Sequence, residues 1–293
     1  MEPTSARALL AKYGLAPSRE RGQSFLSDPN VARKVVDAVD PRGDEIVVEI
    51  GPGLGAITFG LAERAAHVVA VEYDAGLVRA FREEYGSADG ITLVHGDALD
   101  LDLRGIAESH GVGEVVLAGN LPYSITSPAI GLAIEARERV GRAVFMVQKE
   151  VADRLLSEPG ARDYSALTAI VRFHASVRAH FPVRGTCFHP RPAVDSMVVE
   201  IEPRTPDEGD VDPGLYSKVV HAAFGTRRKM LRRALARLAR EAGTSVGALE
   251  VESGIDLTRR GETLSVEEFG SLARALGSER ARRDPKATNA RSD

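Results

Sequence analysis

The sequence predicts an α/β protein in which an open, mostly parallel sheet is followed by a small all-helical C-terminal domain. Short β-branched segments with little polar alternation predict the sheet, and segments with helical spacing lie between them. A linker rich in proline, glycine and acids, at 203–214, separates this part from a series of helical patterns. With 293 residues, the chain is long enough for one large domain and one small domain.

Five segments in the first half of the chain have the composition of strands that are buried on both faces. Helical spacing at 75–85 and 127–137 places helices between them. After Tyr164 the pattern changes, and two further strands follow without a helix between them. We expect these two strands to add an antiparallel edge to the parallel sheet. The five parallel strands are expected at 44–51, 66–72, 90–97, 113–120 and 142–149, and the two later strands at 176–183 and 195–203.

The segment after the linker has three or four helical patterns, at 213–224, 226–241, about 245–253 and 265–276. The last has a capping-box signature, with Ser265 as the N-cap and Glu268 three residues later. We therefore expect a sheet domain over 1–204, a helical domain over 212–277 and a disordered basic tail over 278–293.

Composition narrows the class of protein. The chain is 43% hydrophobic, and no apolar run approaches the roughly 18 residues that a membrane-spanning helix needs. The first 25 residues show no secretory signal. A single cysteine, Cys187, excludes an internal disulfide framework and a cysteine-rich metal site, and the seven histidines show no paired ligand spacing. We predict a cytoplasmic, metal-free monomer.

Charge is distributed unevenly along the chain. A formal net charge of −4 argues against a nucleic-acid partner, yet the segment 227–240 has seven basic residues and no acidic one. Binding to phosphates depends on local potential, so this segment is a candidate RNA-binding helix face, although most charged helix faces are merely solvated. The candidate RNA-binding residues are Arg227, Arg228, Lys229, Arg232 and Arg233.

A glycine-rich corner, "EIGPGLGA" at 49–56, follows a strand and opens a helix. Gly51 and Gly53 let the backbone turn sharply and approach a ligand, although a plain strand-to-helix turn has the same composition. Glu72 ends the next strand, 21 positions after Gly51, where an acid accepts hydrogen bonds from a ribose diol. Asp97 lies at the end of the third strand and can accept from an adenine amino group or cap a helix.

The fourth strand ends in "NLPY", which is Asn120, Leu121, Pro122 and Tyr123. Pro122 fixes its own φ and keeps Leu121 out of the helical region, so the carbonyls near Leu121 have a set direction. An amide oxygen, a fixed carbonyl and an aromatic face suit the exocyclic amine of adenine, which is a poor nucleophile that must be positioned. Asn and Pro are also common turn formers, so an ordinary turn is the alternative.

Together these motifs resemble the small-subunit rRNA adenine dimethyltransferases. The similarity extends to "GQSFLSD" (22–28), "EIGPGLG" (49–55), "FHPRPAVDSMVV" (188–199), "FGTRRKMLRRAL" (224–235) and "ETLSVEEF" (262–269). The resemblance implies a Rossmann-like class I fold that binds S-adenosylmethionine, with 1–204 as the catalytic domain and 212–277 as the RNA-recognition domain. It also implies dimethylation of N6 on two adjacent adenines in the 3′-terminal hairpin of 16S rRNA, within a precursor of the 30S subunit.

The resemblance implies roles for individual residues as well. Tyr123 and Phe188 would flank the target adenine, with a buried core phenylalanine as the alternative for Phe188. Ser24 departs from the family pattern, which usually has asparagine there, so a cofactor contact through its shorter side chain is in doubt. The implied cofactor-binding residues are Ser24, Leu26, Gly51, Gly53, Glu72, Asp97 and Asn120, and the implied catalytic residues are Asn120, Leu121, Tyr123 and Phe188.

Three alternatives stay open at this point. A resistance-type 23S rRNA methyltransferase would use the same chemistry on the large subunit. An NAD-dependent oxidoreductase would use the same glycine corner, although the sequence has no evident relay of side chains for hydride transfer. A non-catalytic ribosome-assembly factor would keep the fold and the RNA-binding surface.

Overall fold

The computed structural model describes residues 5–18, 22–122, 124–204, 211–226 and 229–283. The chain forms two compact units. Unit 1 comprises Met1–Ala152 and Ala175–Arg204, and unit 2 comprises Asp153–His174 and Thr205–Asp293. Unit 1 contains the sheets, whereas the described part of unit 2 consists of helices with one isolated β-bridge.

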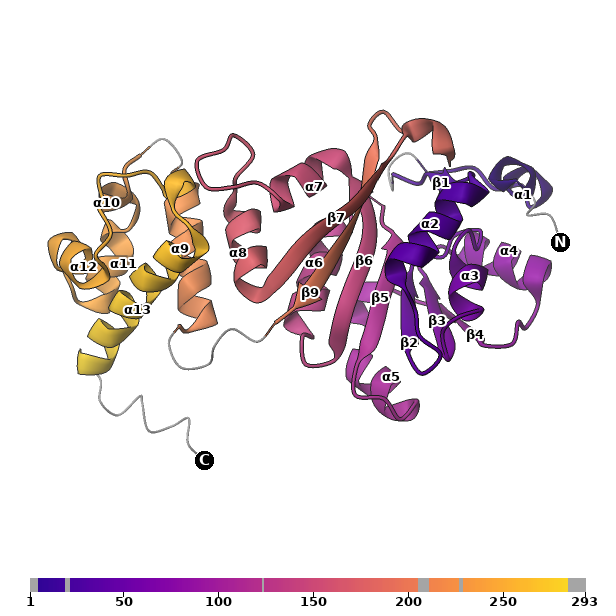
Figure 1. Ribbon diagram of the computed structural model, residues 1–293, viewed down its shortest axis with the longest axis horizontal. Helices are drawn as coiled ribbons and strands as arrows, with labels where there is room; N and C mark the ends of the chain where they lie inside the picture. The colour runs from indigo at the N-terminus through magenta and orange to yellow at the C-terminus, as the bar shows by residue number, and fades with distance from the viewer. Residues whose placement is uncertain (1–4, 19–21, 123, 205–210, 227–228, 284–293) are drawn as a thin grey trace. The chain divides into compact units, whose positions relative to one another are not determined.

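Unit 1 is built on a seven-stranded sheet with the strand order β4-β3-β2-β5-β6-β9-β7 (Figure 1). The first five strands in this order are parallel, and β9 pairs antiparallel with both β6 and β7. All seven predicted strands are present, and the predicted antiparallel addition is confirmed. The strands are β2 (Ile46–Ile50), β3 (His67–Glu72), β4 (Ile91–His95), β5 (Val115–Asn120), β6 (Val140–Gln148), β7 (Ala175–Val183) and β9 (Ser196–Pro203).

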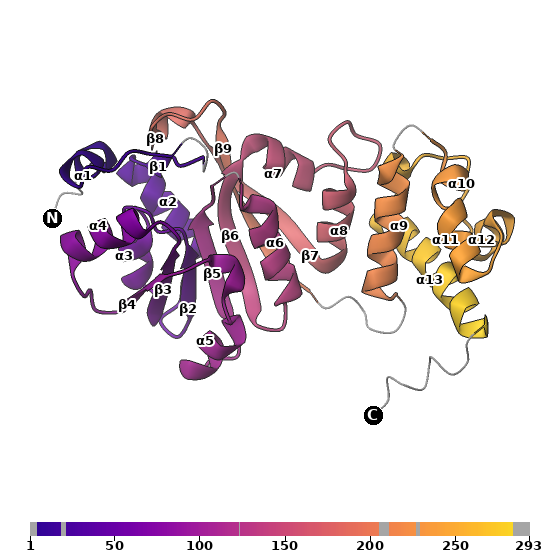
Figure 2. The ribbon, with the colours of Figure 1, turned by 180° about the vertical axis from the view of Figure 1, so that it is seen from behind.

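Helices cover both faces of this sheet. α2 lies in front of it in Figure 1 and α6 in front of it in Figure 2, and both helices contact β6. Asp28 caps α2 by accepting from the Asn30 amide at 2.9 Å, and Asp74 caps α4 by accepting from the Gly76 amide at 2.8 Å. The helices that begin in unit 1 are α1 (Ala6–Lys12), α2 (Pro29–Val39), α3 (Thr58–Ala62), α4 (Ala75–Tyr85), α5 (Leu103–Ser109), α6 (Thr126–Glu135) and α7 (Lys149–Leu155).

The order in which the chain adds parallel strands to the sheet reverses between β2 and β5. From β2 the chain proceeds to β3 and β4 on one side, whereas β5 is followed by β6 on the other side. In open α/β sheets, a ligand binds outside the carboxyl ends of the strands at such a reversal. The glycine-rich corner follows β2 and Asn120 ends β5, so both motifs lie at the expected place.

A second, two-stranded sheet joins segments that are far apart in the sequence. β1 (Phe25–Leu26) pairs antiparallel with β8 (Phe188–His189), with Phe25 opposite His189 and Leu26 opposite Phe188. The Ser27 amide extends the pairing by donating to the Cys187 carbonyl at 2.8 Å. This pairing places the segment 22–28 beside the loop that carries Phe188.

Unit 2 has its own hydrophobic core, centred on the buried rings of Tyr216 and Phe269. α8 belongs to this core because Phe173 stacks on Tyr216 with ring centroids 3.8 Å apart, and the Tyr216 hydroxyl donates to the Ala169 carbonyl at 3.0 Å. The segment 153–174 therefore packs with the C-terminal helices, whereas the sequence placed it in the first domain. The helices are α8 (Ala166–His174), α9 (Pro213–Gly225), α10 (Leu231–Ala234), α11 (Ala236–Ala242), α12 (Val246–Ser253) and α13 (Val266–Arg283).

The basic segment is not the single helix that its spacing predicts for 226–241. Met230 is extended and forms a β-bridge with Arg260, and the Leu231 amide donates to the Arg259 carbonyl at 2.9 Å. These bonds hold Met230 in an extended conformation, so α10 begins only at Leu231. α10 and α11 are two separate short helices.

The capping box of α13 is confirmed. The Glu268 amide donates to the Ser265 hydroxyl at 3.2 Å, and the Ser265 amide donates to the Glu268 carboxylate at 2.8 Å. α13 continues to Arg283, so residues 278–283 are helical where the sequence predicted the start of a disordered tail. Among the described residues, no helix has the length and apolar character required to cross a membrane.

Candidate functional site: a cofactor and adenine pocket

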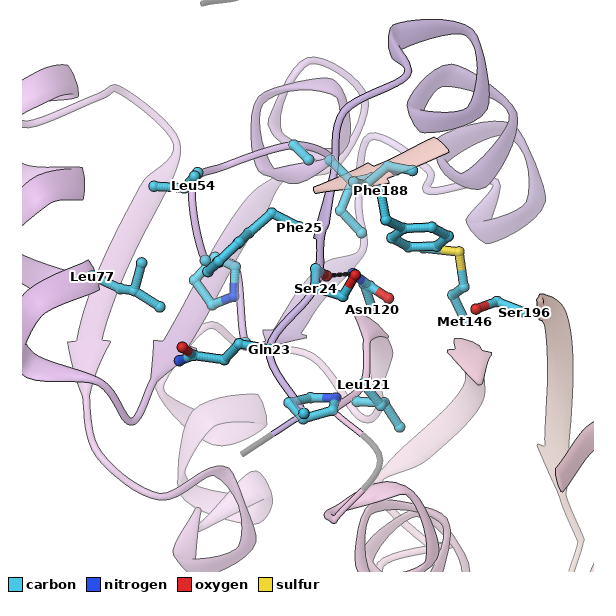
Figure 3. Close-up of a pocket in the computed structure, with 18 of the residues that line it drawn as sticks. Gln23, Ser24, Phe25, Leu54, Leu77, Asn120, Leu121, Met146, Phe188 and Ser196 are labelled. Atoms are coloured by element: carbon cyan, nitrogen blue, oxygen red, sulfur yellow. Dashed lines mark hydrogen bonds between the residues drawn. The ribbon is translucent and has the colours of Figure 1, made fainter. Parts of the chain in front are cut away.

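A cavity in unit 1 lies at the carboxyl ends of β2 and β5. Residues 22–26 form one wall; they belong to the segment 22–28, which we call the strap. The other walls are the glycine-rich corner, the "NLP" segment and the loop around Phe188. Figure 3 shows Gln23 and Leu77 on one side of this cavity and Phe188 on the other, with Ser24 and Asn120 between them. The topology thus brings together motifs that are separated by more than 160 positions in the sequence.

The glycine-rich corner has the sharply turned backbone that its composition predicts. Gly51 and Gly53 have φ values of 69° and 58°, in the left-handed region that favours glycine. A Cβ on Gly53 would lie 3.2 Å from the ring of Phe25, whereas a Cβ on Gly51 would meet no heavy atom of the protein within 4 Å. Gly51 therefore leaves its backbone open to a ligand at the carboxyl end of β2.

Glu72 ends β3 and lies against this corner. Its Oε2 accepts from the Gly53 amide at 3.1 Å, and its Oε1 accepts from the Asp74 amide at 2.9 Å. The side chain is buried, and burial raises the pKa of its carboxyl. The two amide bonds orient the carboxyl group toward the cavity that Gly51 also lines.

Glu49 is a cavity residue that the sequence analysis did not select. It lies in β2, is 2% exposed, and its Oε2 has no hydrogen-bond partner among the described residues. Burial raises its pKa to about 8, because an ionised carboxylate is costly in an apolar environment. An acid in the otherwise apolar run "IVVEI" was the signal that would have identified it.

A second cavity continues from the first on the side of β3 and β4. Gln23, Gly51, Glu72 and Pro122 line both cavities, so the two form one elongated site. Asp97 lines the second cavity, and it also caps the 3-10 helix Ala98–Asp100 by accepting from the Leu99 amide at 2.9 Å. Asp97 therefore caps this helix, as its alternative interpretation predicted, and it also lines the cavity.

Asn120 is held by the strap. Its Nδ2 donates to the Ser24 carbonyl oxygen at 3.1 Å, as the dashed line in Figure 3 shows. Because a carbonyl can only accept, the amide nitrogen must face Ser24, and Oδ1 is turned away from it. Leu121 is buried, and its amide donates to the Met146 carbonyl at 3.1 Å. The side chain of Asn120 and the backbone of Leu121 are thus both held in place at the carboxyl end of β5.

The remaining predicted residues have different surroundings. Leu26 is buried and lines the first cavity. Ser24 lines it too, but its hydroxyl donates to the Pro190 carbonyl at 2.6 Å. Phe188 is 6% exposed and packs in the hydrophobic core of unit 1, which is its alternative interpretation, and it also lines the cavity. Tyr123, Arg227 and Arg228 lie outside the described residues.

The described basic residues of the segment 227–240 are exposed. These are Lys229, Arg232 and Arg233, with Arg237 and Arg240 further along. Acidic side chains neutralise part of this surface: Arg232 pairs with Glu250 at 3.1 Å and Arg237 with Glu241 at 3.3 Å. No cluster of three or more metal-ligating side chains occurs in the ranges that the structure describes.

The elongated site fits S-adenosylmethionine. The glycines let the backbone approach a ligand, and Glu72 presents a carboxyl group of the kind that accepts from a ribose diol. The two buried acids, Glu49 and Glu72, both have raised pKa values, and a cationic ligand beside them would favour their ionised forms. The cavity therefore suits a ligand that carries both a ribose and a positive charge.

Comparison with known proteins decides the family. The family model described as ribosomal RNA adenine dimethylase matches residues 17–276. The chain belongs to this family. It is thus an S-adenosylmethionine-dependent rRNA adenine dimethyltransferase, as the sequence motifs predicted, and the NAD-dependent alternative is wrong.

Relatives of the chain agree with this assignment. The ribosomal RNA small subunit methyltransferase A of Moorella thermoacetica is 42% identical over 281 residues, which cover 94% of this chain and 97% of the relative. The protein of the same name from Myxococcus xanthus is 40% identical and covers 93% and 95% of the two chains.

Solved structures are similar in fold. A dimethyladenosine transferase from Plasmodium falciparum superimposes with a TM-score of 0.71 at 24% identity, over 87% of this chain and 98% of that one. The 23S rRNA methyltransferase ErmE superimposes with a TM-score of 0.64 at 25% identity, over 86% and 99%. The predicted Rossmann-like methyltransferase fold is confirmed.

Proposed function

We propose that this protein dimethylates N6 of two adjacent adenines in the 3′-terminal hairpin of 16S rRNA, on a precursor of the small ribosomal subunit. The name that the relatives carry, small subunit methyltransferase A, supports the choice of subunit. The observation that carries the chemistry is the bond from Asn120 Nδ2 to the Ser24 carbonyl, which orients the Asn120 amide. Unit 1 would perform catalysis, and unit 2 would bind the RNA.

The proposed mechanism relies on positioning. Asn120 Oδ1 and the Leu121 carbonyl would accept hydrogen bonds from the N6 amine of the target adenine. Two acceptors on one NH₂ group favour a more tetrahedral nitrogen, whose lone pair is then available for reaction. The bound cofactor supplies the electrophilic methyl group on its sulfonium. The Pro122 carbonyl already accepts from the Ile125 amide at 3.1 Å, which leaves Leu121 as the backbone acceptor in our assignment.

Other residues of the cavity would place the two substrates. Glu72 would accept from the ribose of the cofactor and Asp97 from its adenine amine, and the glycine-rich corner would approach its methionine part. Phe188 would stack on the extruded target base, which compensates for the stacking lost in RNA. The exposed Lys229, Arg232 and Arg233 would contact RNA phosphates, which is how structured RNA is mainly recognised.

The test of this function is a map of methylated adenines. Purified protein is incubated with unmethylated 30S and 50S particles and labelled S-adenosylmethionine, and the products are sequenced by mass spectrometry. We expect four methyl groups on two adjacent adenines of 16S rRNA. Label that enters only the large subunit would overturn the proposal in favour of the 23S alternative.

Asn120→Ala separates catalysis from assembly-factor binding. We expect it to lower methylation by about 100-fold or more, because a positioned acceptor is lost from the reacting centre, while RNA binding is kept. Asn30→Ala, which changes an exposed asparagine in α2, is the matched control. Unchanged turnover in Asn120→Ala would refute the proposed role of the amide.

A further inference from the structure

Ser24 makes two hydrogen bonds that lead to two different parts of the candidate site. Its backbone carbonyl accepts from Asn120 Nδ2 at 3.1 Å. Its hydroxyl donates to the Pro190 carbonyl at 2.6 Å, in the loop that follows Phe188. Ser24 therefore links the amide at the end of β5 to the loop that carries the aromatic ring.

The connection between strap and loop is otherwise small. β1 and β8 contribute two residues each, the Ser27 amide donates to the Cys187 carbonyl, and the Cys187 thiol donates to Asp28 Oδ2 at 3.9 Å. A two-stranded ladder of this length is marginal on its own. The bond from the Ser24 hydroxyl reaches Pro190, one residue beyond β8, and so extends the connection at the end nearest to Asn120.

The single proton of the Ser24 hydroxyl is committed to Pro190. A serine hydroxyl has one O–H donor, so in this geometry the side chain has no donor left for the carboxylate of a bound amino acid. The asparagine that the family usually has at this position is longer and has a different set of donors. In this chain the side chain at position 24 bonds to the Phe188 loop.

We propose that Ser24 is a positioning residue for methyl transfer, which holds Asn120 and the Phe188 loop in fixed positions around the target adenine. In this proposal its side chain does not bind the cofactor. The inference rests on the proposed function of Asn120. It predicts that loss of the hydroxyl affects turnover and the use of RNA, whereas cofactor binding stays intact.

The test compares Ser24→Ala with Ser24→Thr, which retains a hydroxyl, and with Ser27→Ala. Ser27 lies in the same strap, and its hydroxyl donates only locally, to the Phe25 carbonyl at 3.2 Å. For each variant, the Kd for S-adenosylhomocysteine is measured by calorimetry, and kcat and KM are measured on unmethylated 30S particles. Circular dichroism verifies that each variant is folded.

For Ser24→Ala we expect kcat/KM for the particles to fall about tenfold and the Kd for S-adenosylhomocysteine to stay within twofold of the wild-type value. Ser24→Thr should recover most of the activity, and Ser27→Ala should behave as wild type. The inference is overturned if Ser24→Ala weakens S-adenosylhomocysteine binding tenfold with turnover kept at saturating cofactor, or if neither quantity changes. A wild-type protein that leaves 30S particles unmethylated would instead refute the proposed function itself.

Discussion

The buried carboxyl of Glu49 predicts a specific dependence of stability on pH. Its pKa is raised from 4.5 to about 8, so the folded protein keeps this proton in a range of pH where the unfolded chain releases it. A group that binds its proton more tightly in the folded state costs stability as the pH rises between these two values. Glu49→Gln removes the titration, with little change in the size of the side chain.

The magnitude follows from the size of the pKa shift. For each unit that the pH rises between 4.5 and about 8, the free energy of unfolding of the wild type falls by up to ~1.4 kcal/mol relative to that of the variant. Between pH 5 and pH 7, the free energy of unfolding of Glu49→Gln should therefore gain about 2 to 3 kcal/mol on that of the wild type. The gain should level off above pH 8, where both states of the wild type are ionised.

Urea unfolding followed by circular dichroism, at half-unit steps from pH 5 to pH 9, measures this difference. The chain has no tryptophan, so circular dichroism is preferred to intrinsic fluorescence. Glu63→Gln, at an exposed position after α3, serves as the control for removing an acid from this unit. Parallel profiles for the wild type and Glu49→Gln would refute the reasoning, because they would mean that Glu49 titrates alike in both states.

Three further predictions concern the units and the RNA surface. Ser265→Ala removes the N-cap of α13 and should lower the free energy of unfolding by ~1 kcal/mol in urea; no loss would mean that the capping box is not stabilising. Arg142→Met should lower the free energy of unfolding by about 2 to 3 kcal/mol, because the guanidinium donates to the Val39 carbonyl at 2.9 Å and to Glu45 at 2.7 Å. A variant that melts at the wild-type temperature would contradict this. Arg233→Ala should reduce the slope of log K against log salt for rRNA binding by about 1, and an unchanged slope would remove this residue from the interface.

The sheet could be predicted from sequence because its strands have a local signal. Parallel strands covered on both faces read as continuous β-branched runs, and β2 and β5 are buried along nearly their whole length. Gly51 follows β2, Glu72 ends β3 and Asn120 ends β5, and the topology alone could place all three at one edge of the sheet. They do line the same cavity.

The features that were missed depend on contacts between distant residues. β1 and β8 are two residues long and about 160 positions apart, so neither has a periodicity to detect. The break before α10 arises from hydrogen bonds between Met230–Arg232 and the segment 257–260. The local sequence pattern does not predict these bonds, because the two segments are far apart along the chain. Glu49 was overlooked because the apolar residues around it led the run to be interpreted as core alone.

The membership of α8 in unit 2 has a consequence for the modularity of this enzyme. The polypeptide leaves unit 1 after Ala152, returns at Ala175 and leaves again after Arg204, so the helical unit is assembled from two separate stretches of chain. A truncation in the linker would keep α8 but remove α9, so Phe173 and Ala169 would lose their contacts with Tyr216. A functional exchange of helical units between relatives must therefore transplant 153–174 together with the C-terminal segment, as two coordinated insertions in one gene.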